Sequence, residues 1–231
     1  MSKIRMAFKG WGVRSILRGD KFVTRRLVTR ANSLVGGIPA PKWAWDMLDW
    51  SKAWIDLGPS PAGNPGPYWK VPTTEPDPAL RTVHRVYQRH EVGDTLIMCE
   101  SLYRDGSSVG LARYEDPDGP LALKDRAHVA DPWRWKRDTL SPRFMPSALS
   151  RATLPLVSVT PSIVQVDMDD AEALREGVTP DEMTTPLEAF VKVWVQIHGE
   201  GSWEQMTPCW RYEWTPDGTK LHGNSAVAKG E

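Results

Sequence analysis

Residues 13–26 read VRSILRGDKFVTRR, and this stretch governs how the rest of the chain is interpreted. Its first half is suited to packing. Val13, Ile16 and Leu17 have the i, i+3, i+4 spacing of a single buried face, which predicts a short helix. Gly19 follows at the position where a helix end favours a residue that accepts a positive φ angle. We therefore expect a packed helix that ends in a tight turn.

The second half of the stretch carries reactive groups. An amine, a hydroxyl and two guanidinium groups follow the turn within six residues, at Lys21, Thr24, Arg25 and Arg26. A hydroxyl is a weak nucleophile until a base removes its proton, and a desolvated lysine can be that base. Lys21 and Thr24 share a face only if the turn keeps helical curvature, since they diverge in an extended segment. The competing interpretation is a solvated turn lysine beside an ordinary strand threonine.

Length and charge bound the class of protein. The 231 residues suffice for one large domain or two small ones, and 29 basic side chains balance 29 acidic ones, so no global field favours a polyanionic partner. The distribution is uneven: residues 1–30 hold nine Lys or Arg and one acid, while residues 167–188 hold eight acids and one base. A basic and an acidic face are expected. Two solvated surfaces that attract each other are the competing interpretation.

Cysteines and histidines give no sign of a metal site. Cys99 and Cys209 both lie in apolar, strand-like runs, which is typical of buried thiols rather than of a disulfide framework or a zinc site. The five histidines lack ligand spacing, so neither a metal nor a cofactor is expected. No apolar run approaches a membrane span and no secretory signal opens the chain, which predicts a soluble cytoplasmic protein without a membrane partner.

Hydrophobic patterning predicts a mainly β chain with a few helices. Strands are expected at residues 3–8, 82–87, 95–103 and 209–214, and the longest strand pattern comprises residues 152–159 and 163–166. Helices are expected at 41–55, 167–177 and 185–199. Pro155 indicates an edge or a bulge in the long strand. The 41–55 helix would carry Trp43, Met47, Trp50 and Trp54 at helical spacing. Thr185 to Glu188 forms a capping box with Pro at the first helical position.

Two polar excursions interrupt this pattern, at about residues 31–82 and 104–140. Residues 58–67 of the first form a Pro-Gly run that neither a helix nor a strand accepts. This run is a candidate lid, and a passive surface loop is the competing interpretation. Residues 111–114 of the second excursion are a candidate hairpin arm. Residues 216–231 are expected to be a flexible tail, which leaves 1–215 as a single domain.

Further candidate binding residues lie outside the opening stretch. Glu100 ends a buried run, so its carboxylate either lines a cavity or pairs with a cation, for which Arg25 or Arg26 is the expected partner. Trp133 and Arg134 belong to a segment that interleaves indoles with cations, which suits bases and phosphates of a nucleic acid. The same composition suits Trp–Arg stacking within a fold. The chain has twelve tryptophans, and for any single one core burial is the better prediction.

Several motifs together resemble the ASCH family, a relative of the PUA-like barrels, in its large phage and prophage members. The opening G-x-K-x-x-T-R-R pattern is followed, in the family's order, by Val92-Gly93-Asp94-Thr95-Leu96 with Glu100, by Ser141-Pro142-Arg143-Phe144-Met145-Pro146, by Ala173-Leu174-Arg175-Glu176-Gly177-Val178, and by residues 199–203 and 210–214. The resemblance covers most of the chain. It implies an α+β fold: a PUA-like mixed β-barrel with flanking helices and the two excursions as insertions.

The resemblance also implies an activity. Small bacterial ASCH proteins are amidohydrolases that deacylate N4-acetylcytidine with a Lys, a Thr and a Glu, which here correspond to Lys21, Thr24 and Glu176. Glu176 on a helix surface is the competing interpretation. The chain departs from the family pattern at Asp20 and Phe22, and by its two long excursions.

Three hypotheses follow from the sequence. The first is an enzyme acting on a modified nucleoside or nucleotide through Lys21, Thr24 and Glu176. The second is a binding module without chemistry for RNA or single-stranded DNA. The third is a phage accessory protein that binds a host protein through its Trp-rich first excursion. The side chains expected to contact the substrate are Arg25, Arg26, Glu100, Trp133, Arg134 and Arg143.

Overall fold

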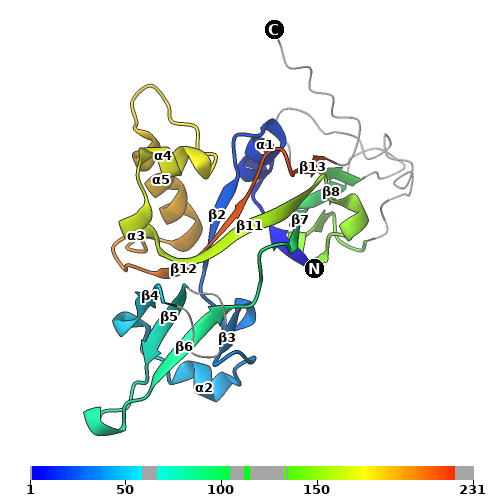
Figure 1. Ribbon diagram of the computed structural model, residues 1–231. Helices are drawn as coiled ribbons and strands as arrows, with labels where there is room; N and C mark the ends of the chain where they lie inside the picture. The colour runs from blue at the N-terminus through cyan, green and yellow to red at the C-terminus, as the bar shows by residue number, and fades with distance from the viewer. Residues whose placement is uncertain (1, 59–66, 105–111, 115–132, 134, 222–231) are drawn as a thin grey trace.

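The computed structural model describes all residues except 1, 59–66, 105–111, 115–132, 134 and 222–231. Within this part of the chain, three sheets and a few helices form a mixed α+β arrangement (Figure 1). The described strands are β1 (Lys3–Ala7), β2 (Val23–Leu27), β3 (Ser33–Val35), β4 (Trp54–Asp56), β5 (Tyr68–Pro72), β6 (Val83–Gln88), β7 (Thr95–Cys99), β8 (Leu102–Arg104), β9 (Ala112–Tyr114), β10 (Thr139–Leu140), β11 (Ala152–Ile163), β12 (Pro208–Trp214) and β13 (Lys220–Leu221). The described α-helices are α1 (Gly10–Arg18), α2 (Lys42–Asp46), α3 (Val164–Asp167), α4 (Asp170–Arg175) and α5 (Pro186–His198).

The largest sheet has the strand order β1-β7-β11-β12-β2, and β13 pairs with β11. β1 and β7 are parallel, whereas the other pairs are antiparallel. Pairing runs from β1 to β2 without closing, so the expected α+β class is confirmed but the described strands form no closed barrel. The guanidinium of Arg26 on β2 donates to the carbonyl of Ala7 on β1, which links the two end strands by a side chain.

The long strand β11 organises this sheet. Its first residues pair with β7 up to Pro155, and from Leu156 it pairs with β12. The register of the β12 pairing shifts between Leu156 and Ser158. Proline has no N–H to donate, so it is tolerated where the ladder is irregular. The bulge predicted near Pro155 is therefore confirmed, although β11 lies in the middle of the sheet.

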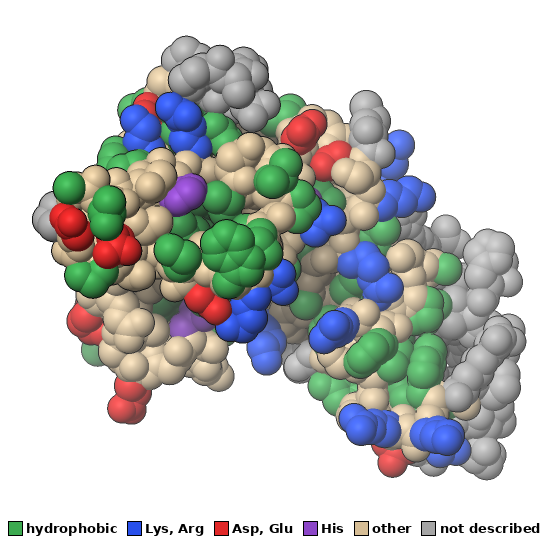
Figure 2. Space-filling view, turned by 90° about the horizontal axis from the view of Figure 1, so that it is seen from below, with side chains coloured by type: hydrophobic (Ala, Val, Ile, Leu, Met, Phe, Trp, Pro, Cys, Tyr) green, Lys and Arg blue, Asp and Glu red, His purple; other side chains and the backbone are tan. Residues whose placement is uncertain are grey.

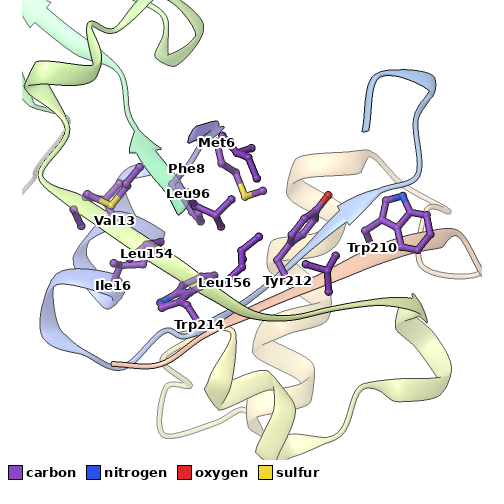
Figure 3. Close-up of a cluster of buried hydrophobic side chains, with 14 of the residues drawn as sticks. Met6, Phe8, Val13, Ile16, Leu96, Leu154, Leu156, Trp210, Tyr212 and Trp214 are labelled. Atoms are coloured by element: carbon purple, nitrogen blue, oxygen red, sulfur yellow. The ribbon is translucent and has the colours of Figure 1, made fainter. Parts of the chain in front are cut away.

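The first excursion is built into the core. It supplies β3, β4 and β5, which join β6 in a four-stranded antiparallel sheet of order β3-β6-β5-β4. Trp69, Val71 and Val86 of this sheet have no exposed surface and belong to the same apolar cluster as Leu96 and Leu154. Figure 3 shows the main-sheet part of the cluster, which includes Leu96, Leu154 and Leu156. In the same cluster the Phe8 ring packs edge-on against Trp214.

Four secondary-structure predictions were wrong in extent. The strand expected to reach residue 166 ends at Ile163, and α3 begins at the next residue. The helix expected at 41–55 is only α2, because Asp49 N–H donates to the carbonyl of Pro72 and the chain then enters β4. The strand expected at 95–103 breaks after Cys99, since Glu100 N–H donates to Met145 Sδ instead of continuing the ladder. The tail expected at 216–231 contains β13, which pairs with β11, while residues 222–231 lie outside the described chain.

The helix ends agree with the sequence signals. Gly19 caps α1 at a φ angle of 81°, Gly177 follows α4 at 79°, and Gly199 follows α5 at 95°. Thr185 and Glu188 form the predicted reciprocal capping box. α4 and α5 pack on the start of β12 through a separate apolar cluster that includes Phe190, Trp194 and Cys209. These helices thus cover the end of the main sheet that carries Thr24 and Arg25.

The second excursion contributes a third sheet of order β10-β8-β9. β9 confirms the predicted hairpin arm, and much of the remaining excursion lies outside the described residues, as does most of the Pro-Gly run at 58–67. On the face in Figure 2, most acidic side chains lie at the left and most Lys and Arg lie at the centre and right. Among the described helices, none has the length and apolarity that crossing a bilayer requires.

Candidate active site

A cavity of about 110 Å³ lies between β2, α1 and α5. One part of its wall is polar and comes from the turn and strand after α1 together with the end of α4. The other part is apolar and comes from α1, from α5 and from Phe8 just before α1. The polar part comprises Lys21, Thr24, Arg25, Arg26 and Glu176; the apolar part includes Phe8, Trp11, Phe190, Val193 and Trp194. The three residues proposed as catalytic therefore line one hollow.

Lys21 is held by the turn that follows α1. The backbone N–H groups of Asp20 and Lys21 both donate to the carbonyl of Ser15, at 2.8 and 3.1 Å. The Lys21 ammonium donates to Glu176 Oε2 at 2.6 Å and to the Glu176 carbonyl at 2.5 Å. Burial lowers the pKa of Lys21, and the neighbouring Glu176 carboxylate opposes that shift. Lys21 is thus a buried amine, and the solvated-turn interpretation does not hold.

Gly177 makes room for the Lys21 side chain. A Cβ at this glycine would lie 2.6 Å from Lys21 Cβ and 2.7 Å from Ser15 Cβ, closer than packed atoms allow. The Ser15 hydroxyl donates to the Gly177 carbonyl at 2.8 Å and so ties α1 to the end of α4. The glycine after Glu176 therefore serves two purposes: it accepts a positive φ angle, and it lets the lysine stem pass.

Thr24 lies on β2 opposite Tyr212 of β12 and is buried. Its side chain lines the cavity, and among the described residues its hydroxyl has no hydrogen-bond partner. A buried hydroxyl normally finds a partner within the protein or in water. Thr24 therefore offers the cavity a donor and acceptor that the surrounding fold does not use.

Arg25 is committed to the protein. Its guanidinium donates to Glu176 at 3.1 Å, to Glu172 at 3.0 Å and to the hydroxyl of Ser162 at 3.1 Å. Glu172 also accepts from Arg211 at 2.6 Å. Burial raises the pKa of Glu172, but Arg211 and the two other arginines around it lower it further, so the net shift is downward. Three of the five N–H donors of Arg25 are thus used within the protein, and the guanidinium orients Glu176.

Arg26 is placed differently. Its guanidinium stacks over the Phe8 ring at 5.0 Å and lines the cavity. Burial lowers the pKa of Arg26, with a counteracting contribution from Glu176. The Nε atom of Arg26 has no hydrogen-bond partner among the described residues. Arg26 therefore lines the cavity with an unused donor at Nε.

The remaining predicted binding residues lie elsewhere. The carboxylate of Glu100 forms a two-point ion pair with Arg151, at 2.8 and 2.6 Å, so the expected pairing with Arg25 or Arg26 was wrong. The Trp133 indole packs on Trp135 and donates to the Arg137 carbonyl at 2.8 Å. Arg143 is exposed beside Phe144. Arg134 lies outside the described residues.

Several residues of the site were not singled out from the sequence. Ser15 and Glu172 act on Lys21 and Arg25 through contacts that join distant segments, and no local pattern marks such contacts. Trp194 and His198 line the cavity from α5. The 3.6-residue period of α5 indicates its apolar face, but not that part of this face borders a hollow. Among the described residues, no group of three His, Cys, Asp or Glu side chains gathers in a way that would hold a metal ion.

Comparison of the chain with protein-family models, with curated proteins and with solved structures gave no match.

Proposed function

We propose that this chain is an ASCH-type, PUA-like protein that hydrolyses the amide bond of an acylated nucleobase such as N4-acetylcytidine. The observation that carries the proposal is the convergence of Lys21, Thr24 and Glu176 on one cavity, although 155 positions separate Lys21 from Glu176. The family resemblance assigns roles to the same three residues. The alternative, a nucleic-acid-binding module without chemistry, draws less support, because Arg25 and Glu100 are engaged in internal ion pairs.

The first half of the reaction transfers the acyl group to the enzyme. Lys21 in its neutral form removes the proton of the Thr24 hydroxyl. Thr24 Oγ1 then bonds to the acyl carbon, and the C–N bond breaks as the Lys21 ammonium returns its proton to the leaving amine. The free amino base leaves, and an acyl ester remains on Thr24.

The second half restores the enzyme. Water attacks the ester carbon while Lys21 accepts a proton. The C–O bond to Thr24 then breaks as Lys21 gives the proton back to Thr24, which releases the carboxylic acid. Glu176 keeps the amine in position throughout, and Arg26 is the guanidinium available for the negative charge that develops on the acyl oxygen.

The size of the cavity limits what it can accept. Its volume of about 110 Å³ is below the roughly 150 Å³ of a protein cavity known to hold benzene. The cavity therefore suits a short acyl group together with the edge of the nucleobase ring that carries it. A sugar would have to remain outside. This favours a small acyl substituent, such as acetyl, over a long or aromatic one.

The test is the release of acetate from N4-acetylcytidine, with cytidine followed by chromatography. Thr24→Val and Lys21→Met are expected to reduce kcat/KM at least about a thousandfold, because each removes a group that takes part in bond making. Glu176→Gln is expected to cost about 10- to 100-fold, because it weakens the positioning of Lys21.

Lys42→Met is the matched control, since Lys42 is an exposed lysine on α2, and it should leave the rate unchanged. Thermal unfolding of every variant establishes that it is folded. The proposal is wrong if the folded wild-type protein releases no acetate, or if Thr24→Val and Lys21→Met turn over at the wild-type rate.

A further inference from the structure

A second hollow adjoins the cavity. It has a volume of about 460 Å³ and lies between α1 and the segment that runs from the end of α4 into α5, toward the top of Figure 1. We call it the α1–α5 groove. Its polar lining consists of the cations Arg14, Arg18 and Lys192, the hydroxyls of Ser15, Thr179 and Thr184, and the carboxylate of Asp181.

The groove and the cavity share a wall. Trp11 and Val193 line both hollows. The Trp11 ring lies 5.6 Å from the Lys21 ammonium, so the shared wall stands directly beside the candidate base. Ser15 fixes the spacing of the two sides, because its hydroxyl contacts the carbonyls of Trp11 at 3.1 Å and Gly177 at 2.8 Å. A ligand group outside the cavity can therefore reach the groove across Trp11.

The charge of the groove is suited to an anion. Three cations face one carboxylate, and that carboxylate is used locally, since Asp181 accepts from the Thr184 hydroxyl at 2.8 Å and from Met183 N–H at 3.0 Å. Arg18 forms an ion pair with Asp20 at 2.7 Å, and both side chains are more than half exposed. Such a surface pair is weak and can be exchanged for another anion. Lys192 is exposed.

We infer that the α1–α5 groove binds a phosphate ester of the ligand whose base enters the cavity, so that the substrate class is a nucleotide or an RNA chain rather than a free nucleoside. This inference rests on the proposed function for the occupant of the cavity. The small cavity leaves the sugar and its phosphate outside, and the groove is the adjoining hollow in which cations outnumber acids. Guanidinium and ammonium groups form charge-assisted hydrogen bonds with phosphate oxygens.

The experiment compares three ligands by titration calorimetry: N4-acetylcytidine, its 5′-monophosphate, and a short single-stranded RNA with one N4-acetylcytidine. A Thr24→Val protein is used so that none of the ligands is consumed. We expect a phosphate-bearing ligand to bind about tenfold more tightly than the nucleoside, and the advantage to shrink as salt is added. A gain for the monophosphate identifies a free nucleotide, and a gain for the RNA alone identifies the nucleic-acid backbone.

Arg18→Ala combined with Lys192→Ala should abolish the advantage of the phosphate while leaving nucleoside affinity unchanged. Lys3→Ala combined with Lys42→Ala removes two exposed charges far from the groove and is the matched control. The inference is overturned if nucleoside and phosphate-bearing ligands bind equally, or if the advantage survives the groove variant. A third outcome separates the two proposals. If the phosphate-bearing ligand binds more tightly but the unsubstituted protein releases no acetate from any ligand, the groove inference holds and the proposed function is wrong.

Discussion

At the scale of single residues, two opposing effects act on the pKa of Lys21. Removal from water favours its neutral form, whereas a carboxylate at 2.6 Å favours its charged form, and the net effect is a lowered pKa. A base must be neutral to accept a proton. The proposed reaction should therefore slow as the pH falls through the lowered pKa of Lys21.

The first prediction concerns this pH dependence. A plot of kcat against pH should rise along a limb whose midpoint lies below 10.5, the ordinary pKa of a lysine side chain. The same shift acts on stability. The unfolded chain binds the Lys21 proton more tightly, so the contribution of Lys21 to stability should increase with pH between the lowered pKa and the ordinary one. A limb centred at or above the ordinary lysine value would contradict a buried base.

The second prediction concerns Cys209. Burial raises the pKa of its thiol to about 12, so almost none of it is thiolate near neutral pH. In a Cys99→Ser background, a chromogenic disulfide reagent at pH 8 should react with Cys209 only as fast as the protein opens. Adding denaturant should restore the rate of a free thiol. Rapid labelling of the native protein would show that the thiol is accessible.

Individual residues also show where sequence reasoning works. Lys21 and Thr24 stand out because they lie in one short stretch after a turn, and Glu176 stands out through its motif; the three side chains line one cavity. The partner of Glu100 could not be predicted. Arg151 lies 51 positions away, just before β11, and the pairing of β11 with β7 brings the two together.

At the scale of secondary-structure elements, the end of α4 acts as a support for the turn after α1. Phe22 N–H donates to the carbonyl of Arg175 at 3.1 Å, and Gly177 packs directly against the stem of Lys21. The position of the amine therefore depends on a helix end far away in the chain.

The third prediction tests this support. Gly177→Ala puts a side chain where φ is 79° and where Lys21 and Ser15 leave no space. The left-handed conformation costs about 1–2 kcal/mol for a residue with a Cβ, and the overlap adds about 1–3 kcal/mol. Acetate release should fall with stability, because Lys21 is displaced. The measurements are chemical denaturation and kcat/KM.

Gly93→Ala is the matched control, since Gly93 has a φ angle of 92° and nothing within 4 Å of the added Cβ. It should show the conformational cost alone, with unchanged kcat/KM for the folded protein. If Gly177→Ala and Gly93→Ala change stability and kcat/KM equally, the close packing of Gly177 on Lys21 does not contribute to activity.

The helix bounded by a capping box was predicted well, whereas the helix expected at 41–55 from spacing alone was not. Thr185 and Glu188 mark the start of α5 by hydrogen bonds within a single turn, which are local and so visible in the sequence. Trp43, Met47, Trp50 and Trp54 have helical spacing, yet β4 pairs with β5 instead. A ladder with a distant strand outweighed the weak local preference for helix.

At the scale of the whole molecule, the four-stranded sheet and the main sheet share one apolar cluster. The first excursion is therefore part of what stabilises the fold. Two sheets with a common core are expected to unfold together rather than in separate steps.

The fourth prediction follows. Trp69→Ala should lower the free energy of unfolding by about 3–5 kcal/mol, because Trp69 has no exposed surface and its removal leaves a void. Denaturation followed by fluorescence and by far-ultraviolet circular dichroism should still give coincident, single transitions. Trp43→Ala, at a side chain that is 69% exposed, should change stability by no more than about 0.5 kcal/mol. Two separate transitions would mean that the sheets are energetically independent.

The sequence predicted the α+β class and most of the strands of the main sheet, because strand patterns and turn residues are local. It did not predict that the sheet stays open or that the first excursion packs against it. Both features depend on which strands pair with each other. A tryptophan such as Trp69 looks the same in the sequence whether it covers a groove or fills a core.

The link between Arg26 and Ala7 has a consequence for substrate range. The outermost strands β1 and β2 are joined there by a guanidinium instead of a row of main-chain bonds, and Phe8 and Thr24 of the cavity wall lie on either side of this join. Their separation can increase without breaking any ladder. The enzyme we propose should therefore tolerate acyl groups somewhat bulkier than its resting dimensions allow, at the expense of slower turnover.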